Sequence, residues 1–214
     1  MYECHYAQVM LSAGTDTSSG IMEWTLSALL NNPACLTKAQ KEIDVKIGYS
    51  RLINDSDLGG LSYLHGVINE TFRMYPVAPL LAPHISSEEC IVGGYRVPRG
   101  SMLIVNSWAM QNDPELWEDS TKFKPERFVD MEGQKYGFVF MPFGHGRRGC
   151  PGENLAMRVV ELTLGLVLQC FDWERVGEEL VDMSEGPGLT MPKANPLVAK
   201  CRTRPEMIKL LSHL

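Results

Sequence analysis

The sequence lacks several features that would assign it to a class at once. Its six cysteines include no C-x-x-C pair, which argues against a disulfide framework or structural zinc site and favours a reducing compartment. Basic residues are outnumbered, 20 against 26 acidic, and form no cluster longer than Arg147-Arg148, so nucleic acid is not an expected partner. No stretch of about 18 uncharged apolar residues occurs. No signal peptide and no transmembrane segment are therefore expected in this chain.

What is present indicates a globular fold rich in helices. With 214 residues, 44% of them hydrophobic, the chain can bury a sizeable core. Apolar periodicity and breaker residues predict helices at about residues 6–30, 33–47, 62–75 and 152–171, with short pieces at 108–112 and 114–117. Strands are expected on both sides of Gly93-Gly94, at 102–106 and as short segments in 180–201. The predicted class is mainly α with small antiparallel β-sheets (α+β).

The first expected helix carries only two charges, Asp16 and Glu23, and is apolar on every side, so it is predicted to be buried at the centre of the fold. Core candidates on it are Val9, Met10, Leu11, Ile21, Met22, Trp24, Leu26 and Leu29, and on the last helix Leu155, Val159, Leu162, Leu166 and Leu168.

Asp16 would be costly to bury in such a helix unless it is used. Ala13 and Gly14 remove side-chain bulk just before it, which leaves room for a small ligand such as dioxygen. A competing interpretation is that the Thr17 hydroxyl bonds back to the helix beside an incidental acid.

The stretch "PFGHGRRGCPG" at 142–152 supports several chemistries. Gly144, Gly146 and Gly149 match G-x-G-x-x-G, which in a dinucleotide site follows a strand, opens a helix and precedes an acid by about 20 residues. Asp172 supplies the acid, but Pro142 interrupts the approach, the helix starts only after Cys150, and no second β-α-β unit is found. The dinucleotide interpretation is therefore disfavoured.

Three interpretations of Cys150 remain open. It could be a buried structural cysteine, or a phosphatase-type nucleophile, although the next arginine, Arg158, lies two turns into the helix. It could also be a metal ligand, because a cysteine just before a helix has unpaired backbone N–H groups and the positive end of the dipole near its sulfur. Glycines around it permit close backbone approach and leave room for a flat group, which suits an axial haem ligand. Arg148 would then be available for a haem propionate.

The motif F-x-x-G-x-R-x-C-x-G is complete as Phe143, Gly146, Arg148, Cys150 and Gly152. Together with "AGTDTS" at 13–18, "ETFR" at 70–73 and "PERF" at 125–128, in that order, it resembles the C-terminal half of a cytochrome P-450, the haem-thiolate monooxygenase family. The resemblance covers nearly the whole chain. The segments "GGYRVPRG" and "GLTMPKANPLVAKCR" look most like plant members that hydroxylate isoflavonoids and related phenylpropanoids.

The resemblance implies a role for each motif. Cys150 would be the axial ligand of the iron of haem b, within a cofactor site that includes Ala13, Gly14, His84, Phe143, Gly146, Arg148 and Gly152. Asp16 and Thr17 would deliver protons to bound oxygen. Glu70, Arg73 and Arg127 would form a buried structural network, although an i,i+3 pair such as Glu70–Arg73 is elsewhere commonly a solvated surface pair. Substrate contacts would come from Val77, Leu80, Leu81, Leu189 and Thr190.

The resemblance also implies an activity and its partners. The expected reaction inserts one oxygen atom from O₂ into a small hydrophobic or aromatic substrate, with electrons from NADPH through NADPH-cytochrome P-450 reductase. Residues 1–214 are expected to be a single partial domain, the haem-binding part of a longer protein whose N-terminal half and membrane anchor lie outside this chain. The full-length family implies the cytosolic face of the endoplasmic reticulum membrane. The alternatives are a truncated, non-catalytic fragment and a peroxide-rearranging haem-thiolate enzyme, which does not need Asp16 and Thr17.

Overall fold

The structure is a computed structural model that describes residues 2–129 and 137–213, apart from the side chains of 2–7 and 9. Its α-helices are α1 (Tyr2–Asn31), α2 (Pro33–Lys46), α3 (Ser62–Met74), α4 (Ser107–Asn112), α5 (Glu153–Cys170) and α6 (Ile208–Leu211). Its 3₁₀ helices are η1 (Asp55–Gly60), η2 (Pro125–Phe128), η3 (Gly137–Val139), η4 (Gly146–Arg148) and η5 (Pro205–Met207). Its strands are β1 (His84–Ile85), β2 (Cys90–Val92), β3 (Tyr95–Val97), β4 (Met102–Leu103), β5 (Phe171–Arg175) and β6 (Ala199–Thr203).

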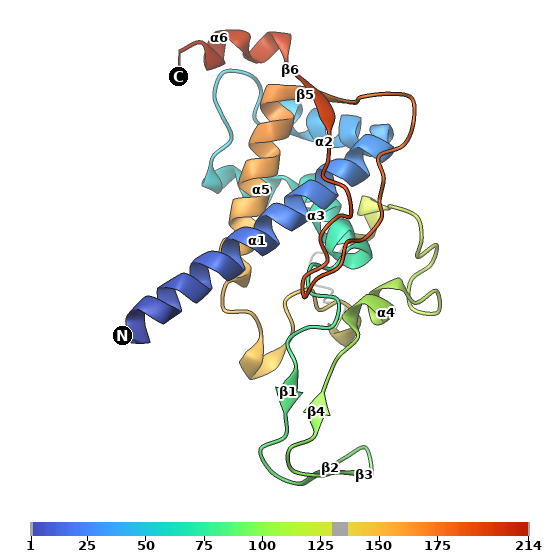
Figure 1. Cartoon of the computed structure of the whole chain (residues 1–214). Coiled ribbons are helices and arrows are strands. Elements are labelled where there is room, and N and C mark those ends of the chain that lie inside the picture. The colour runs from blue at the N-terminus through green and yellow to red at the C-terminus, as the bar shows by residue number, and fades with distance from the viewer. Residues whose placement is uncertain (1, 130–136, 214) are drawn as a thin grey trace.

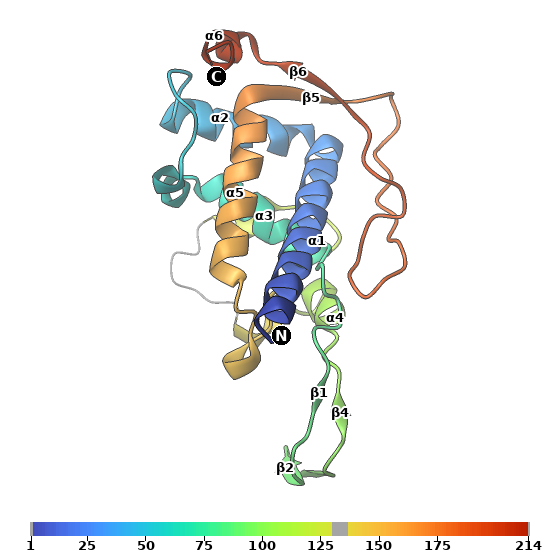
Figure 2. The same cartoon turned by 60° about the vertical axis from the view of Figure 1, so that its left-hand side comes forward.

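Helices α1, α3 and α5 form the centre of the molecule, and α2 packs on all three (Figures 1 and 2). Their apolar faces make one continuous core, because no single amphipathic helix can remove its own apolar side from water. The helix ends follow the sequence: α2 begins at Pro33, whose missing N–H costs nothing at that position, and α3 ends before Tyr75-Pro76. None of the described helices is both long enough and apolar enough to span a bilayer.

Three two-stranded antiparallel sheets accompany the helices, which confirms the predicted fold class. Strands β2 and β3 form the predicted hairpin, with Cys90 opposite Val97 and with Gly93 and Gly94 at φ of 58° and 86°. A two-residue turn with both φ values positive strongly favours glycine. Strands β1 and β4 continue the same arm, which projects from the helical body (Figure 1).

Several of the strand and helix predictions were wrong. Residue 171, predicted as helical, begins strand β5, which pairs with β6 from Phe171↔Thr203 to Arg175↔Ala199, a contact between distant segments that local periodicity does not reveal. Most of 180–201 is irregular, with a single bridge between Glu185 and Lys193 besides the start of β6. Residues 114–117 form a turn, in which the Trp117 N–H donates to the Asp113 carbonyl at 2.9 Å.

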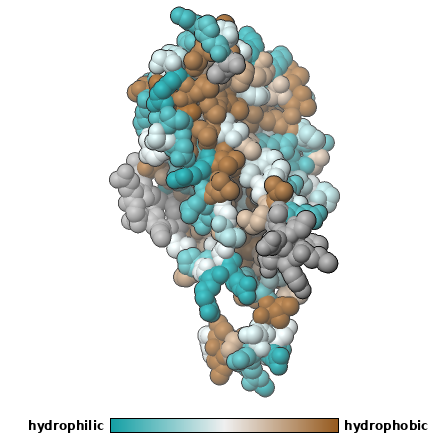
Figure 3. All heavy atoms as spheres, turned by 90° about the vertical axis from the view of Figure 1, so that its left-hand side faces the viewer, coloured by the Kyte–Doolittle hydropathy of each residue, from teal (hydrophilic) through white to brown (hydrophobic). Residues whose placement is uncertain are grey.

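The prediction that the first helix is buried on every side is corrected by the structure. Burial begins at Ser18, whereas Met10 and Leu11 are 54% and 71% exposed, and the Asp16 side chain is also exposed. On α5, Leu155 and Val159 are likewise exposed, and hydrophobic atoms reach the surface on this side of the molecule (Figure 3). The physical reason is that α1 and α5 pack on the core through their C-terminal parts. Val9 lies outside the described side chains.

We expect Gly66→Ala to destabilise the protein. A Cβ at Gly66 would lie 2.7 Å from the Pro125 carbonyl oxygen and 3.1 Å from Val129, so α3 and η2 would have to separate. Overpacking of this kind costs about 1–3 kcal/mol. Urea unfolding measures it, with Gly20→Ala as the control because an added Cβ there has no neighbour within 4 Å. Equal stability of the two variants would contradict the close contact between α3 and η2.

Candidate functional site

The loop that precedes α5 presents a cysteine sulfur to solvent. Gly144 and Gly146 both have φ of 73°, and they let the chain fold back so that the Cys150 N–H donates to the Phe143 carbonyl at 2.8 Å. Gly152 is the residue just before α5 begins, and Cys150 itself is exposed. The thiol therefore lies just before the start of an 18-residue helix, near the free backbone N–H groups of its first turn.

This sulfur suits a macrocycle better than a bare metal ion. Among the side chains that the structure describes, which leave out those of residues 2–7 and 9, no group of three or more His, Cys, Asp or Glu could hold a metal. A bare zinc or iron ion would therefore lack ligands here. A porphyrin brings four nitrogen ligands of its own and needs one axial ligand from the protein, which Cys150 can supply. The exposed sulfur and the glycine-rich loop fit such a group.

The loop before α5, residues 141–152, is called the cysteine loop. Two contacts connect it to α3. Phe143 packs edge-on against Phe72, with ring centroids 5.1 Å apart. The Met141 N–H donates to the side-chain oxygen of Gln111 at 3.2 Å, and the Gln111 amide donates to the Phe72 carbonyl at 2.9 Å. Gln111 is fully buried. The sequence reasoning missed this glutamine, because nothing local distinguishes it from a solvated residue in "WAMQND".

The structure brings Glu70, Arg73 and Arg127 together. Arg73 donates a hydrogen bond to each carboxylate oxygen of Glu70, from Nε to Oε2 at 2.8 Å and from Nη2 to Oε1 at 2.9 Å. Both side chains are completely buried, and Arg127 Nε approaches Glu70 Oε1 at 3.3 Å from η2.

The remaining hydrogen-bonding capacity of this network is used on loop backbone. Arg73 also donates to the carbonyls of Gln111 and Ser120, each at 2.8 Å, and Glu70 accepts from the Lys124 N–H at 3.0 Å. A buried ion pair is sustained only when its other donors and acceptors are satisfied, as they are here. The network thus fixes the connection that runs from α4 to η2.

The predicted oxygen-activating residues lie in the exposed N-terminal half of α1. Ala13 and Gly14 are exposed, and no neighbouring atom lies within 4 Å of where a Gly14 Cβ would be. The Thr17 hydroxyl donates to the Ala13 carbonyl at 2.6 Å. This is the bond back to the helix that the competing interpretation of Thr17 predicted. Asp16 Oδ2 accepts from the Thr190 hydroxyl at 3.3 Å.

The predicted substrate-contact segments meet at α1. The Met191 N–H donates to the Val77 carbonyl at 2.9 Å, and Trp24 Nε1 donates to the Met191 carbonyl at 2.8 Å. Val77 is buried, whereas Leu80 and Leu189 are 49% and 90% exposed. Leu81 adopts φ of 50° and is half-buried. Trp24 was predicted as core only. Its role as an anchor for the tail, residues 180–201, depends on a residue 167 positions away.

The two predicted propionate contacts lie at the lower end of the molecule. His84 is exposed in β1, opposite Leu103, and Arg148 is exposed in η4. Figures 1 and 2 both place β1, the loop that contains η4 and the N-terminal half of α1 in this lower part. No described interaction joins His84 directly to Arg148.

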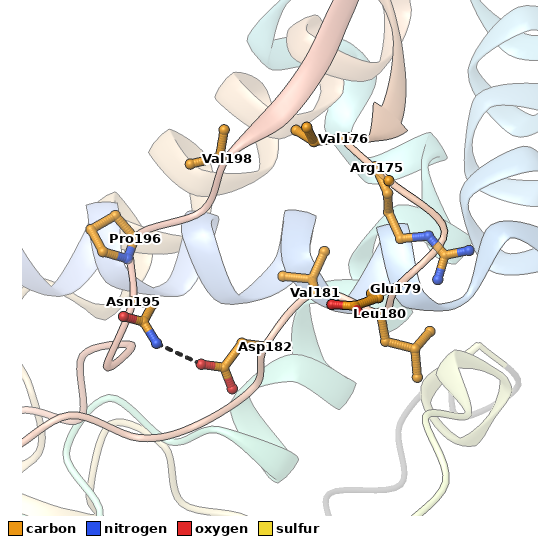
Figure 4. A pocket seen from close by; sticks show the side chains of 10 residues that line it. Arg175, Val176, Glu179, Leu180, Val181, Asp182, Asn195, Pro196 and Val198 are labelled. Carbon is orange, nitrogen blue, oxygen red and sulfur yellow. Dashed lines mark hydrogen bonds between the residues drawn. The ribbon is translucent and has the colours of Figure 1, made fainter.

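A surface hollow of about 310 Å³ lies elsewhere, between the end of β5 and the tail (Figure 4). Its walls include Val176, Leu180, Asp182 and Asn195, and none of the predicted site residues. Hydrogen bonds from the Ser184 and Asn195 side chains lower the pKa of Asp182 to about 2. The hollow therefore lies apart from the predicted site residues.

Comparisons with known proteins match this chain to one family. Residues 5–199 match the family model described as Cytochrome P450. The chain is 54% identical over 206 residues to "Cytochrome P450 81Q32" of Catharanthus roseus and 51% identical over 201 residues to an isoflavone 2'-hydroxylase of Medicago truncatula. These matches cover 95% and 94% of this chain and 40% of each relative. A zebra fish cytochrome P450 structure with abiraterone superposes with a TM-score of 0.85 at 32% identity, over 93% of this chain and 46% of that one.

Proposed function

The chain belongs to the cytochrome P450 family, and on that premise we propose that it is the C-terminal, haem-binding part of a haem-thiolate monooxygenase. It spans about 40% of the length of the curated relatives it matches, so the activity is proposed for the protein that includes this chain. The observation that carries the proposal is the exposed Cys150 sulfur at the start of α5, beside a glycine-rich loop fixed to a buried ion network.

Cys150 would bind the iron of haem b through its sulfur, and Phe143, Gly146 and Gly152 would contact the haem beside it. Arg148 and His84 would hold the propionates. When bound, the haem supplies the redox chemistry that activates dioxygen, while the protein sets its ligand, its proton supply and its pocket. Ala13 and Gly14, which carry little side-chain bulk, would leave room beside α1 for dioxygen.

The net reaction consumes a substrate C–H bond, O₂, NADPH and H⁺, and yields the alcohol, water and NADP⁺. Two electrons come from NADPH through a separate reductase. One oxygen atom enters the substrate, and the other leaves as water after accepting two protons. Asp16 is exposed to solvent and can take up protons from it, and Thr17 lies one residue further along α1. We assign the proton path to this pair.

We propose a flat aromatic substrate of the isoflavonoid or phenylpropanoid class. The support is the 51% and 48% identity to isoflavone 2'-hydroxylases of Medicago truncatula and Glycyrrhiza echinata. Apolar Val77, Leu80, Leu81 and Leu189 would contact such a ring system, with Thr190 beside them. We place the full-length protein on the cytosolic face of the endoplasmic reticulum membrane, with NADPH-cytochrome P-450 reductase as its partner.

A second candidate is that the 214-residue chain is a non-catalytic fragment of such an enzyme. The exposed apolar residues Met10 and Leu11 on α1 favour it, because no described part of this chain fully covers their side chains from solvent. A peroxide-rearranging relative is disfavoured, since it would not need Asp16 and Thr17.

The test is haem reconstitution. We expect the chain, expressed with haem, reduced and exposed to carbon monoxide, to show the red-shifted Soret band of a haem–thiolate complex. Such a band supports the proposed site. Failure to take up haem would refute the proposal that this chain carries a working site and favour the non-catalytic fragment. A carbon monoxide complex without the red shift would contradict thiolate ligation.

A further inference from the structure

We propose that Thr190 is a positioning residue whose hydroxyl orients the Asp16 carboxylate. This contact would couple proton delivery to the tail turn, residues 186–191. This inference rests on the proposed function and adds a role for Thr190 beyond substrate contact. Thr190 Oγ1 donates to Asp16 Oδ2 at 3.3 Å, across 174 positions of sequence. The neighbouring Thr17 hydroxyl donates to the Ala13 carbonyl, so it does not hold the carboxylate in this arrangement.

The backbone on the C-terminal side of Thr190 is held by two hydrogen bonds. Its neighbour Met191 is bonded through its N–H to Val77 and through its carbonyl to Trp24, at 2.9 and 2.8 Å. Trp24 is completely buried and stacks on Tyr75, with ring centroids 4.5 Å apart. A β-branched side chain on such a backbone has few χ1 states, which makes Thr190 a rigid donor.

The rest of the tail is also fastened to α1. Asn31 exchanges two hydrogen bonds with the Val181 backbone, at 2.9 and 2.8 Å, and Glu23 accepts from the Leu197 N–H at 2.7 Å. Asp182 and Asn195 close the base of the tail at 2.7 Å (Figure 4). The tail is therefore anchored at the C-terminal half of α1, and its turn reaches forward to Asp16.

The tail turn also contains predicted substrate contacts, since Leu189 precedes Thr190 directly. A substrate that displaces this turn would move the Thr190 hydroxyl and release Asp16. A substrate that leaves the turn in place would keep the carboxylate oriented. The contact thus provides a physical route by which the shape of the substrate controls proton supply.

The first test needs no haem. In the 214-residue chain, Thr190→Val and Asp16→Ala are each expected to speed hydrogen exchange of the Met191 amide by about two- to ten-fold, the range for loss of one hydrogen bond. The double variant should exchange no faster than the faster single variant. Thr37→Val, at an exposed position of α2, is the control and should leave this amide unchanged. Additive effects of the two substitutions, or unchanged exchange, would overturn the inference.

The second test uses the haem-loaded protein with reductase, NADPH and dioxygen. Without oriented proton delivery, two electrons and two protons leave with O₂ as hydrogen peroxide. Thr190→Val is expected to raise peroxide per NADPH by at least about two-fold, and Thr190→Ser, which keeps the hydroxyl, to restore the parent value. Equal peroxide from the two variants would overturn the inference. Absence of haem uptake would refute only the proposed function, because the exchange test measures the Thr190–Asp16 contact in the protein without haem.

Discussion

Replacing Cys150 with alanine is expected to abolish the haem–thiolate Soret band completely. The reason is chemical: the substitution removes the sulfur that would bind the haem iron, and the red-shifted band requires a thiolate ligand. The Cys150 side chain is exposed, and its backbone N–H, which bonds to Phe143, is unaffected by the substitution. We therefore expect the stability of the apoprotein to change by less than about 0.5 kcal/mol. Carbon monoxide difference spectra and urea unfolding measure the two quantities.

Cys90→Ala is the matched control, because Cys90 is also exposed but lies in β2 of the projecting hairpin. The control should keep the band. Persistence of the thiolate band in Cys150→Ala would show that another cysteine is the ligand. If Cys150→Ala lost the band and also markedly lowered the free energy of unfolding of the apoprotein, Cys150 would have a structural role instead.

Replacing Arg73 with alanine is expected to destabilise the fold by about 3–5 kcal/mol, because it leaves Glu70 buried with much of its charge uncompensated. Arg73 and Glu70 are both 0% exposed in their side chains. The substitution also removes the donors to the carbonyls of Gln111 and Ser120. Two further backbone groups would then lack partners in the interior. Equilibrium unfolding in urea measures the loss.

Arg202→Ala is the control for Arg73→Ala. Arg202 also pairs with a glutamate, at 2.6 Å to Glu174, but the two side chains are 69% and 56% exposed. A solvated pair of this kind contributes about 0–1 kcal/mol. Similar losses in the two variants would contradict the view that the Glu70–Arg73 network organises the core.

The sequence indicated much of this site because its signals are local. Glu70 and Arg73 are one helical turn apart, so any helix over "ETFR" brings them together. The Gly93-Gly94 turn and Pro76, which follows the end of α3, are likewise readable from neighbouring residues. The roles of Gln111 and Trp24 could not be predicted, since each depends on a backbone carbonyl or N–H from a distant segment.

The sequence by itself determined the helix-rich class, the family motifs and the position of Cys150 before a helix. Only the tertiary structure decided which residues are buried. The all-round apolar pattern of α1 predicted burial, yet the structure exposes Asp16 and packs the helix only from Ser18 onward. It also decided that Thr190 meets Asp16 and that β5 pairs with β6. Periodicity records which face of an element is apolar, whereas burial and long-range hydrogen bonds depend on which segments fold against that face.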